Sequence, residues 1–209
     1  MSANAAIPSP EPVPAKRRQI LDGARQVFGE LGYERASVDL IAARAGVSKA
    51  TVYNHFQDKQ ALFVAAVVEE CEALRSGVFR CLERPAGDVE EGLQRLGEKI
   101  MGVFLTPSIA RLYRQAIGES TRLPEIGRMV FERGTVAVQE AVASHLSRLH
   151  QSGALRFEDP RAAAVAFLAL CGGELTTRSR LGVLEYPVEE QVRESVKRAV
   201  QIFLRAFRA

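Results

Sequence analysis

Residues 37–59 read SVDLIAARAGVSKATVYNHFQDK, and this stretch predicts two short helices joined by a tight turn. Ser37 has a side chain suited to cap the first helix. Gly46 stands where a helix end favours a left-handed residue, and Ser48 can cap a second helix directly afterwards. The first helix has one apolar face at helical spacing, made by Val38, Ile41, Ala42 and Ala45. The pattern is typical of a helix-turn-helix, whose second helix usually lies in the major groove of DNA.

A helical wheel separates the residues of the second helix into two faces. At roughly 100° per residue, Val52 and Phe56 fall together and are expected to face the core. Ala50, Thr51 and Asn54 fall on the opposite side, where small and polar side chains can approach base edges. An Asn amide can make two hydrogen bonds to adenine, and Thr or Ala methyl groups suit the methyl group of thymine. We therefore predict base contacts at Asn54, Thr51 and Ala50.

The margins of the same helix suit the DNA backbone. Tyr53 and His55 lie on its two flanks, and Lys49 occupies its first turn. Polar groups there can bond phosphate oxygens, which fixes the register without reading sequence. Asp58 is an N-cap for a further helix, whose first turn carries Lys59. We predict that Lys59 and the amides of that turn hold a phosphate.

An upstream helix completes this domain. Its apolar stripe runs over residues 20–31 and ends at Gly32. Residues 16–60 hold eight Lys and Arg against five Asp and Glu, whereas residues 61–209 hold twenty against nineteen. The net charge of +3 is therefore concentrated in the predicted DNA-binding part, which suits a docking surface.

Over residues 19–63 the chain resembles the TetR family of bacterial transcriptional regulators. The turn, the caps, the apolar faces and the trailing Asp58 and Lys59 match the family's N-terminal domain without a gap. One departure is Ala50, where many members carry Gly, and it leaves open which base pair is read there. The resemblance implies a regulator that binds DNA. The positions that match the family's DNA contacts are Ser37, Ser48, Lys49, Thr51, Tyr53, Asn54, His55 and Lys59.

Two other classes of function remain possible from the sequence. The same kind of turn occurs in helical proteins that bind no DNA, so the chain could be an interaction module. The polar side chains of the second helix and Lys59 argue against this, because such a module has no need of them together. An enzyme is the other class, with Glu119, His145 and Cys171 as a conceivable site. We expect no enzyme, because the sequence has no Gly-rich phosphate loop, no G-x-S-x-G and no H-E-x-x-H.

The cysteines and histidines form no metal-binding pattern. Cys71, Cys81 and Cys171 include no C-x-x-C pair, and an odd number of cysteines without a signal peptide indicates reduced thiols. His145 and His150 would lie about 140° apart on a helix, so they do not form a ligand pair. We expect no metal and no cofactor. The cysteines are expected to be buried as small apolar groups, with a thiol-based redox switch as the alternative.

The sequence predicts an all-α fold of about nine helices. A three-helix helix-turn-helix domain over residues 16–60 precedes a six-helix effector-binding and dimerisation domain over residues 61–209. Residues 1–15 contain alternate prolines and are expected to be disordered. The longest apolar stretch, residues 162–173, is too short to span a membrane. The cysteine pattern leads us to expect a cytoplasmic protein, and the family resemblance implies a bacterial one that associates with the nucleoid when bound to DNA. The six helices are expected at residues 59–82, 88–105, 108–119, 125–150, 160–181 and from 188 to near the C-terminus.

The last two predicted helices suggest a homodimer. Two such helices from each of two chains would form a four-helix interface, as TetR-like proteins use their last two long helices. A two-fold dimer also places two reading helices on half-sites about one helical turn apart. The alternative is that these faces serve only the chain's own core. The faces consist of Ala163, Ala166, Phe167, Leu170, Gly173 and Glu174 on one helix, and Val192, Val196, Val200, Phe203 and Phe207 on the other.

Residues 111–134 resemble the C-terminal domain of an AefR-like subgroup of the same family, with Leu123 in place of the usual Phe. This resemblance implies a repressor that a small, apolar or amphiphilic effector releases from a palindromic operator on double-stranded DNA. We expect the effector to shift the helix at residues 59–82 as a lever and so to change the half-site distance. Core packing or a salt bridge is the alternative for each candidate effector-binding residue. These candidates are Phe104, Arg111, Tyr113, Arg114, Phe131, His145, Phe167, Glu174 and Arg178.

Overall fold

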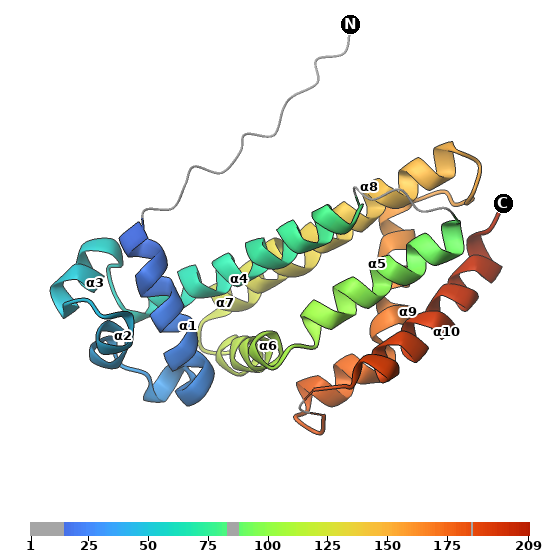
Figure 1. The fold of residues 1–209 in the computed structure, drawn as a ribbon. Coiled ribbons are helices and arrows are strands. Elements are labelled where there is room, and N and C mark those ends of the chain that lie inside the picture. Colours follow the sequence, from blue (N-terminus) through green and yellow to red (C-terminus); the bar gives the residue numbers. More distant parts are fainter. Residues whose placement is uncertain (1–14, 83–87, 185) are drawn as a thin grey trace, which may run out of the picture. The chain divides into compact units, whose positions relative to one another are not determined.

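The computed structural model describes residues 15–82, 88–184 and 186–209 (Figure 1). The prediction for residues 1–15 therefore falls, apart from Ala15, outside the described residues. The chain divides into two units, of which the first ends at Ala66 and the second begins at Val67. Both units are helical, which confirms the all-α prediction.

Unit 1 contains three helices and the first turns of a fourth. They are α1 (Ala15–Arg35), α2 (Val38–Ala45), α3 (Lys49–His55) and α4 (Lys59–Leu82), the last of which continues into unit 2. α1 is interrupted at Gly32, whose φ of 78° and ψ of 169° suit glycine. The core of unit 1 is built from apolar side chains of all four helices. Its largest members are Ile20, Leu21, Phe28, Ile41, Leu62 and Phe63.

Two polar contacts join α1 to α2. The Gln19 side-chain amide donates to the carbonyl of Ala45 at 2.6 Å, which satisfies a backbone acceptor at the end of α2. The Arg44 guanidinium forms a fork with the Glu30 carboxylate at 2.7 and 2.9 Å. This pair is largely exposed, so its main effect is to orient the two helices rather than to stabilise them strongly.

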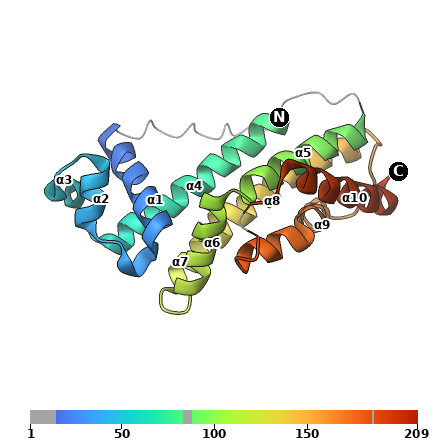
Figure 2. The same cartoon turned by 60° about the horizontal axis from the view of Figure 1, so that its bottom comes forward.

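Unit 2 continues α4, and its main apolar core is built from side chains of α5, α8, α9 and α10. α5, α9 and α10 lie side by side, and α8 packs against α9 (Figure 2). Among the described residues, no helix has the length and apolar character needed to cross a bilayer. The remaining elements are α5 (Val89–Phe104), α6 (Pro107–Glu119), α7 (Pro124–Met129), the π-helix η1 (Val130–Val136), α8 (Ala137–Gln151), α9 (Pro160–Arg180) and α10 (Glu189–Phe207).

The helix predicted over residues 125–150 differs from the observed structure in its middle. The chain there forms α7, then the π-helix η1, then α8. A π-turn holds more residues per turn than an α-turn and so changes which side chains face inward. Val130 and Gly134 are the residues of η1 that become buried. A second break lies in α9 at Gly173, whose φ of 41° and ψ of −134° interrupt the helix.

Gly97 allows α5 to approach α9 and α10 closely. A Cβ atom at this position would lie 2.5 Å from Cγ1 of Val196 and 3.1 Å from Sγ of Cys171. Burial raises the pKa of the Cys171 thiol to about 12, so it stays protonated near neutral pH and is a poor nucleophile. A redox switch at Cys171 is therefore not favoured. The side chains of Cys71 and Cys81 lie outside the described residues.

Two glycines on α1 provide a matched test of the packing in unit 1. A Cβ at Gly23 would lie 2.8 Å from Cβ and 3.0 Å from the backbone nitrogen of Ala45, whereas nothing lies within 4 Å of one at Gly29. We expect Gly23→Ala to destabilise unit 1 by about 1–3 kcal/mol, because backbone must move. Gly29→Ala should instead stabilise α1 by about 0.5–1 kcal/mol. Urea unfolding, with amide exchange in α1 and α2, measures the change in free energy of unfolding for each variant. Equal changes for the two variants would contradict this packing.

Candidate nucleic-acid interface

Side-chain hydrogen bonds cap the start of α2 and the start of α3, and a left-handed glycine forms the turn between the two helices. The Ser37 hydroxyl accepts a bond from the Leu40 amide at 3.2 Å, and the Ser48 hydroxyl accepts one from the Thr51 amide at 3.1 Å. Gly46 is left-handed, with φ 63° and ψ 38°. These observations confirm the predicted caps and the predicted glycine turn.

The two faces of α3 are also confirmed. Val52 and Phe56 are 1% and 6% exposed, so they attach the helix to the core of unit 1. Ala50 and Asn54 are exposed on the outer face. Tyr53, at one margin, is 47% exposed. A short helix with a buried back and a small, polar front has the shape that major-groove reading requires.

Thr51 takes part in the cap of α3. Its hydroxyl oxygen lies 2.8 Å from the Ser48 hydroxyl oxygen, and the residue is half-buried. Only one of the two hydroxyl groups donates this bond, so the other keeps its proton for a contact with DNA, and the donating group can still accept. The methyl group of Thr51 takes no part in this bond, which fits an apolar contact with thymine.

Lys49 forms an ion pair that the sequence did not indicate. Its ammonium lies 2.9 Å from the Asp39 carboxylate in the first turn of α2. The hydrogen bond to Asp39 is the main cause that raises the pKa of Lys49, so the side chain remains charged. Both side chains are more than half exposed, and such surface pairs are weak. A DNA phosphate can therefore take the place of Asp39.

The ammonium of Lys59, which we predicted to hold a phosphate, contacts backbone carbonyls of unit 1 in this structure. The ammonium is part-buried and donates to the backbone carbonyls of Tyr33, Glu34 and Ala36. These bonds use the three donors of the ammonium within unit 1, so a contact with a phosphate would require the side chain to exchange at least one of them. The predicted cap of α4 is present, because the Asp58 carboxylate accepts a bond from the Ala61 amide at 2.7 Å. The backbone of this first turn remains a candidate phosphate site.

Some of the candidate effector-binding residues lie together where α5, α6 and α9 meet. The rings of Phe104 and Tyr113 are 6.2 Å apart and line a cavity of about 20 Å³, which has room for about one water molecule. The Arg114 guanidinium donates to the Ser179 carbonyl of α9 at 2.7 Å. Arg111, also on α6, has a buried Nε atom without a hydrogen-bond partner among the described residues.

The other candidates are distributed elsewhere in unit 2, so the nine residues do not form one pocket. Phe167 is fully buried in the core against Phe203, because α9 turns this face toward α10. Phe131 is 55% exposed. Glu174 and Arg178 form an exposed ion pair at 3.7 Å on the surface of α9. For Phe167, Glu174 and Arg178 these contacts agree with the alternative of core packing or a salt bridge, and their role in effector binding stays a prediction.

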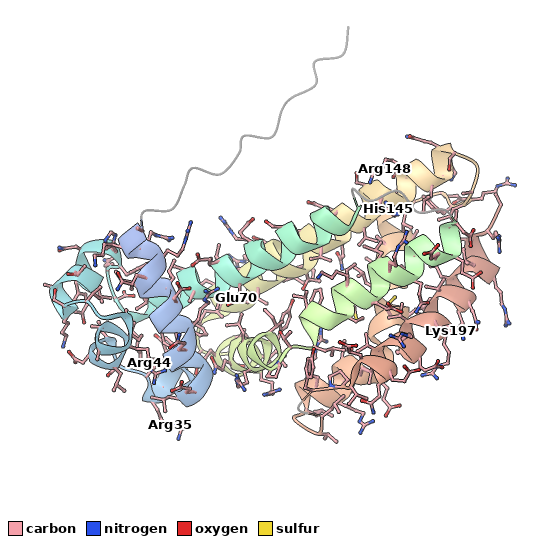
Figure 3. The ribbon with its side chains drawn as sticks, in the orientation of Figure 1. Arg35, Arg44, Glu70, His145, Arg148 and Lys197 are labelled. Carbon is pink, nitrogen blue, oxygen red and sulfur yellow. The ribbon has the colours of Figure 1, made fainter. Side chains whose placement is uncertain are left out.

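His145 lies on α8 beside Arg148, one helical turn away (Figure 3). Its Nδ1 atom is 3.4 Å from the Arg148 guanidinium. Burial, and then the charge of Arg148, lower the pKa of His145, so its ring is neutral at pH 7. The ring is half-buried, and its polar contact is with its own helix.

Comparison with known proteins places both units in one family. Residues 20–66 match the model of the bacterial regulatory proteins of the tetR family, and residues 91–209 match the C-terminal domain of the AefR-like transcriptional repressors. The chain belongs to the TetR family. It is therefore a transcriptional regulator that carries a helix-turn-helix and not an enzyme, and its second unit is of the AefR-like kind.

Individual relatives agree with this assignment. The HTH-type transcriptional repressor Rv1474c of Mycobacterium tuberculosis is 44% identical over 66 residues, which cover 32% of this chain and 35% of that protein. The Flavonoid-responsive Regulator FrrA is 33% identical, with 92% of this chain and 97% of that chain covered and a TM-score of 0.73. A TetR-family regulator structure from Mesorhizobium loti MAFF303099 has a TM-score of 0.85 at 27% identity, covering 93% of this chain and 97% of that chain.

Substitutions at Asn54 and Lys49 should separate base reading from phosphate binding. Asn54→Ala should cost about 1–3 kcal/mol on the preferred duplex and relax the preference at one base position. Lys49→Met should weaken binding to all duplexes and reduce the salt slope of binding by about one. Fluorescence anisotropy across salt concentrations, on preferred and random duplexes, measures both effects. If Asn54→Ala lowered the affinity for both duplexes equally, its assignment to base reading would be wrong.

Proposed function

We propose that the chain is a repressor that binds a palindromic operator as a homodimer and leaves it when a small, largely apolar effector binds unit 2. The observation that carries this proposal is the outer face of α3, which carries Ala50, Thr51 and Asn54, with Tyr53 at one margin and Lys49 in the first turn. The first three residues would contact base edges, and the other two would contact phosphates. Ser37, Ser48 and His55 complete the proposed contact set. The protein would act in the bacterial cytoplasm, where its DNA lies.

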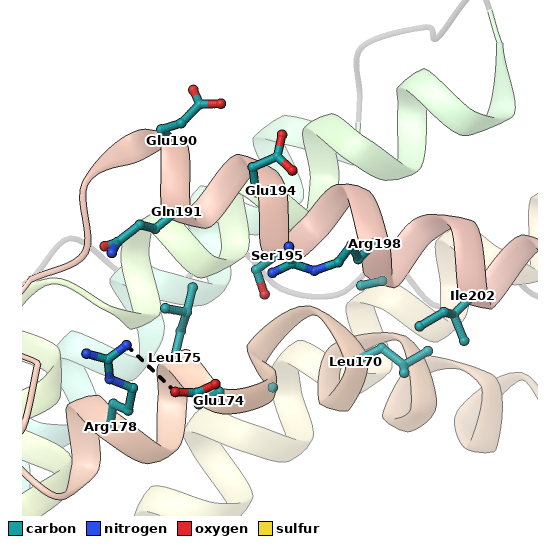
Figure 4. Close-up of a pocket in the computed structure, with 12 residues that line it drawn as sticks. Leu170, Glu174, Leu175, Arg178, Glu190, Gln191, Glu194, Ser195, Arg198 and Ile202 are labelled. Carbon is teal, nitrogen blue, oxygen red and sulfur yellow. Dashed lines mark ion pairs between the residues drawn. The ribbon is translucent and has the colours of Figure 1, made fainter.

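A groove between α9 and α10 supports the proposed dimer (Figure 4). It encloses about 550 Å³ and is lined by apolar Leu170 and Ile202 together with charged side chains of both signs. Ile202 is 52% exposed, although its neighbours Phe203 and Leu204 are buried. In a two-fold interface the same groove meets itself, so Glu194 of one protomer can pair with Arg198 or Arg178 of its partner.

The residues expected on the dimer face require a correction. Six of the side chains named for that face are buried in the core of unit 2, as the alternative interpretation held. Leu170 and Glu174, which were also named for that face, do line the outer groove, together with Ile202, which was not named. The apolar stripes were correctly recognised, but they are covered by the chain's own helices. The six buried residues are Ala163, Phe167, Val192, Val196, Val200 and Phe203.

The effector is proposed to enter beside α6. Phe104 and Tyr113 offer aromatic surface, and the buried Nε of Arg111 offers a hydrogen-bond donor without a partner among the described residues. The aromatic lining favours a flat aromatic molecule. Arg111 does not line the cavity, so an oxygen acceptor would reach its Nε atom only after the cavity widens toward it. A relative of 33% identity is named for its response to flavonoids, which are molecules of this kind. The small cavity must widen to admit such a ligand. The ligand would therefore bind the state with the wide cavity more tightly than the state with the narrow one, and this difference in affinity would shift the protein toward the wide state.

Selection of duplexes from a random pool tests the proposed function. The wild-type protein should enrich a palindrome whose half-sites are about one helical turn apart. Ile202→Glu adds a fourth carboxylate to the groove, beside Glu174, Glu190 and Glu194. Because the groove would meet itself in the dimer, this variant should be monomeric. It should then enrich only single half-sites, with lower affinity. Sedimentation of both proteins measures the oligomeric state.

The matched control is Lys197→Glu. It reverses a charge on the exposed surface of the same helix but does not line the groove. This variant should stay dimeric and recover the same palindrome. Enrichment of no sequence by the wild type would contradict the proposed function and favour an interaction module. Enrichment of a palindrome by a monomeric wild type would contradict the proposed interface.

A further inference from the structure

The ammonium of Lys59 occupies a closed polar site at the end of α1. Its Nζ atom lies 3.0 Å from the Tyr33 carbonyl oxygen, 3.4 Å from that of Glu34 and 3.2 Å from that of Ala36. An ammonium group has three donors, and here there are three acceptors. The same atom lies 4.5 Å from the centre of the Tyr33 ring, which adds a cation–π attraction.

The position of these carbonyls at the end of α1 explains why a cation is favourable beside them. The break at Gly32 ends the regular part of α1, and the carbonyls of Tyr33, Glu34 and Ala36 follow it at the C-terminal end of the helix. The C-terminal end of a helix also carries partial negative charge, which favours a cation nearby. Tyr33 is only 8% exposed and packs against Phe28 and Phe63, so the aromatic wall of this site is fixed.

We propose that Lys59 is a positioning residue for DNA binding. It stands at the first residue of α4, and the Ala36 carbonyl that it holds directly precedes Ser37, the cap of α2. The ammonium therefore ties the start of α4 to the start of α2. Since α2 is joined to α3 by the capped turn at Gly46, a displacement of the first turn of α4 must move the reading helix with it. This inference rests on the proposed DNA binding, but it assigns Lys59 no contact with DNA.

Lys59→Met tests the role of the ammonium in the full-length protein, because methionine keeps an unbranched apolar chain and removes the charge. On the preferred duplex its affinity should fall about tenfold or more, since a misplaced reading helix loses base contacts first. The loss on random duplexes should be smaller. The salt slope should stay close to that of the wild type, because no phosphate contact is removed. Amide exchange at residues 34–37 and 61–62 should become faster.

Three companion variants make the test specific. Lys49→Met is the matched control, and it should reduce the salt slope by about one without changing amide exchange at residues 34–37. Lys59→Arg keeps a cation at the carbonyls and should restore affinity to within about threefold of the wild type. If Lys59→Met fails to fold, Lys59→Gln, whose amide still donates to carbonyls, replaces it and should show the same unchanged slope with an intermediate affinity.

Two results would overturn the proposal. A salt slope reduced by about one, with unchanged amide exchange, would make Lys59 a phosphate ligand. Unchanged affinity and unchanged exchange would leave Lys59 without a positioning role. Amide exchange is measured without DNA, so it tests the role of Lys59 separately from the proposed function. If the wild type shows no duplex preference but exchange is faster in Lys59→Met, the proposed function is contradicted. The inference that Lys59 ties α4 to α2 is then still supported.

Discussion

The burial of Val52 and Phe56 is the interaction on which the proposed DNA-reading surface depends. α3 has only seven residues, and a helix of this length is not stable in water by itself. Two side chains inserted into the core of unit 1, with a capped turn before them, hold it in place. The outer face can then carry small and polar residues that are not needed to pack the core. Stability and recognition are thus assigned to opposite sides of one helix.

The local features of this arrangement could be predicted from the sequence. Ser37, Ser48 and Asp58 each cap the helix that follows, and Gly46 adopts the left-handed conformation expected of it. These features depend on residues within four positions of one another, so a short stretch of sequence determines them. The two faces of α3 follow from helical periodicity for the same reason.

Features that depend on distant partners could not be predicted. Lys59 reaches carbonyls 23–26 residues earlier in the chain, and Lys49 pairs with Asp39 on another helix. Periodicity identified apolar faces on α9 and α10 but not the helices that cover them, so Phe167 and Val196 were assigned to a dimer face although they lie in the core. The predicted helices over residues 125–150 and 160–181 were continuous, so the π-helix η1 and the break at Gly173 were both missed, although Gly172 and Gly173 form a glycine pair.

Chemical protection of the selected duplex tests most directly whether α3 reads the major groove. Dimethyl sulfate methylates guanine at N7 in the major groove and adenine at N3 in the minor groove. With the wild-type protein bound, guanine N7 should be protected in two patches on one side of the duplex, about one helical turn apart, while adenine N3 in those patches stays reactive. Protection of adenine N3 with guanine N7 left reactive, or no protection of either atom, would contradict the account.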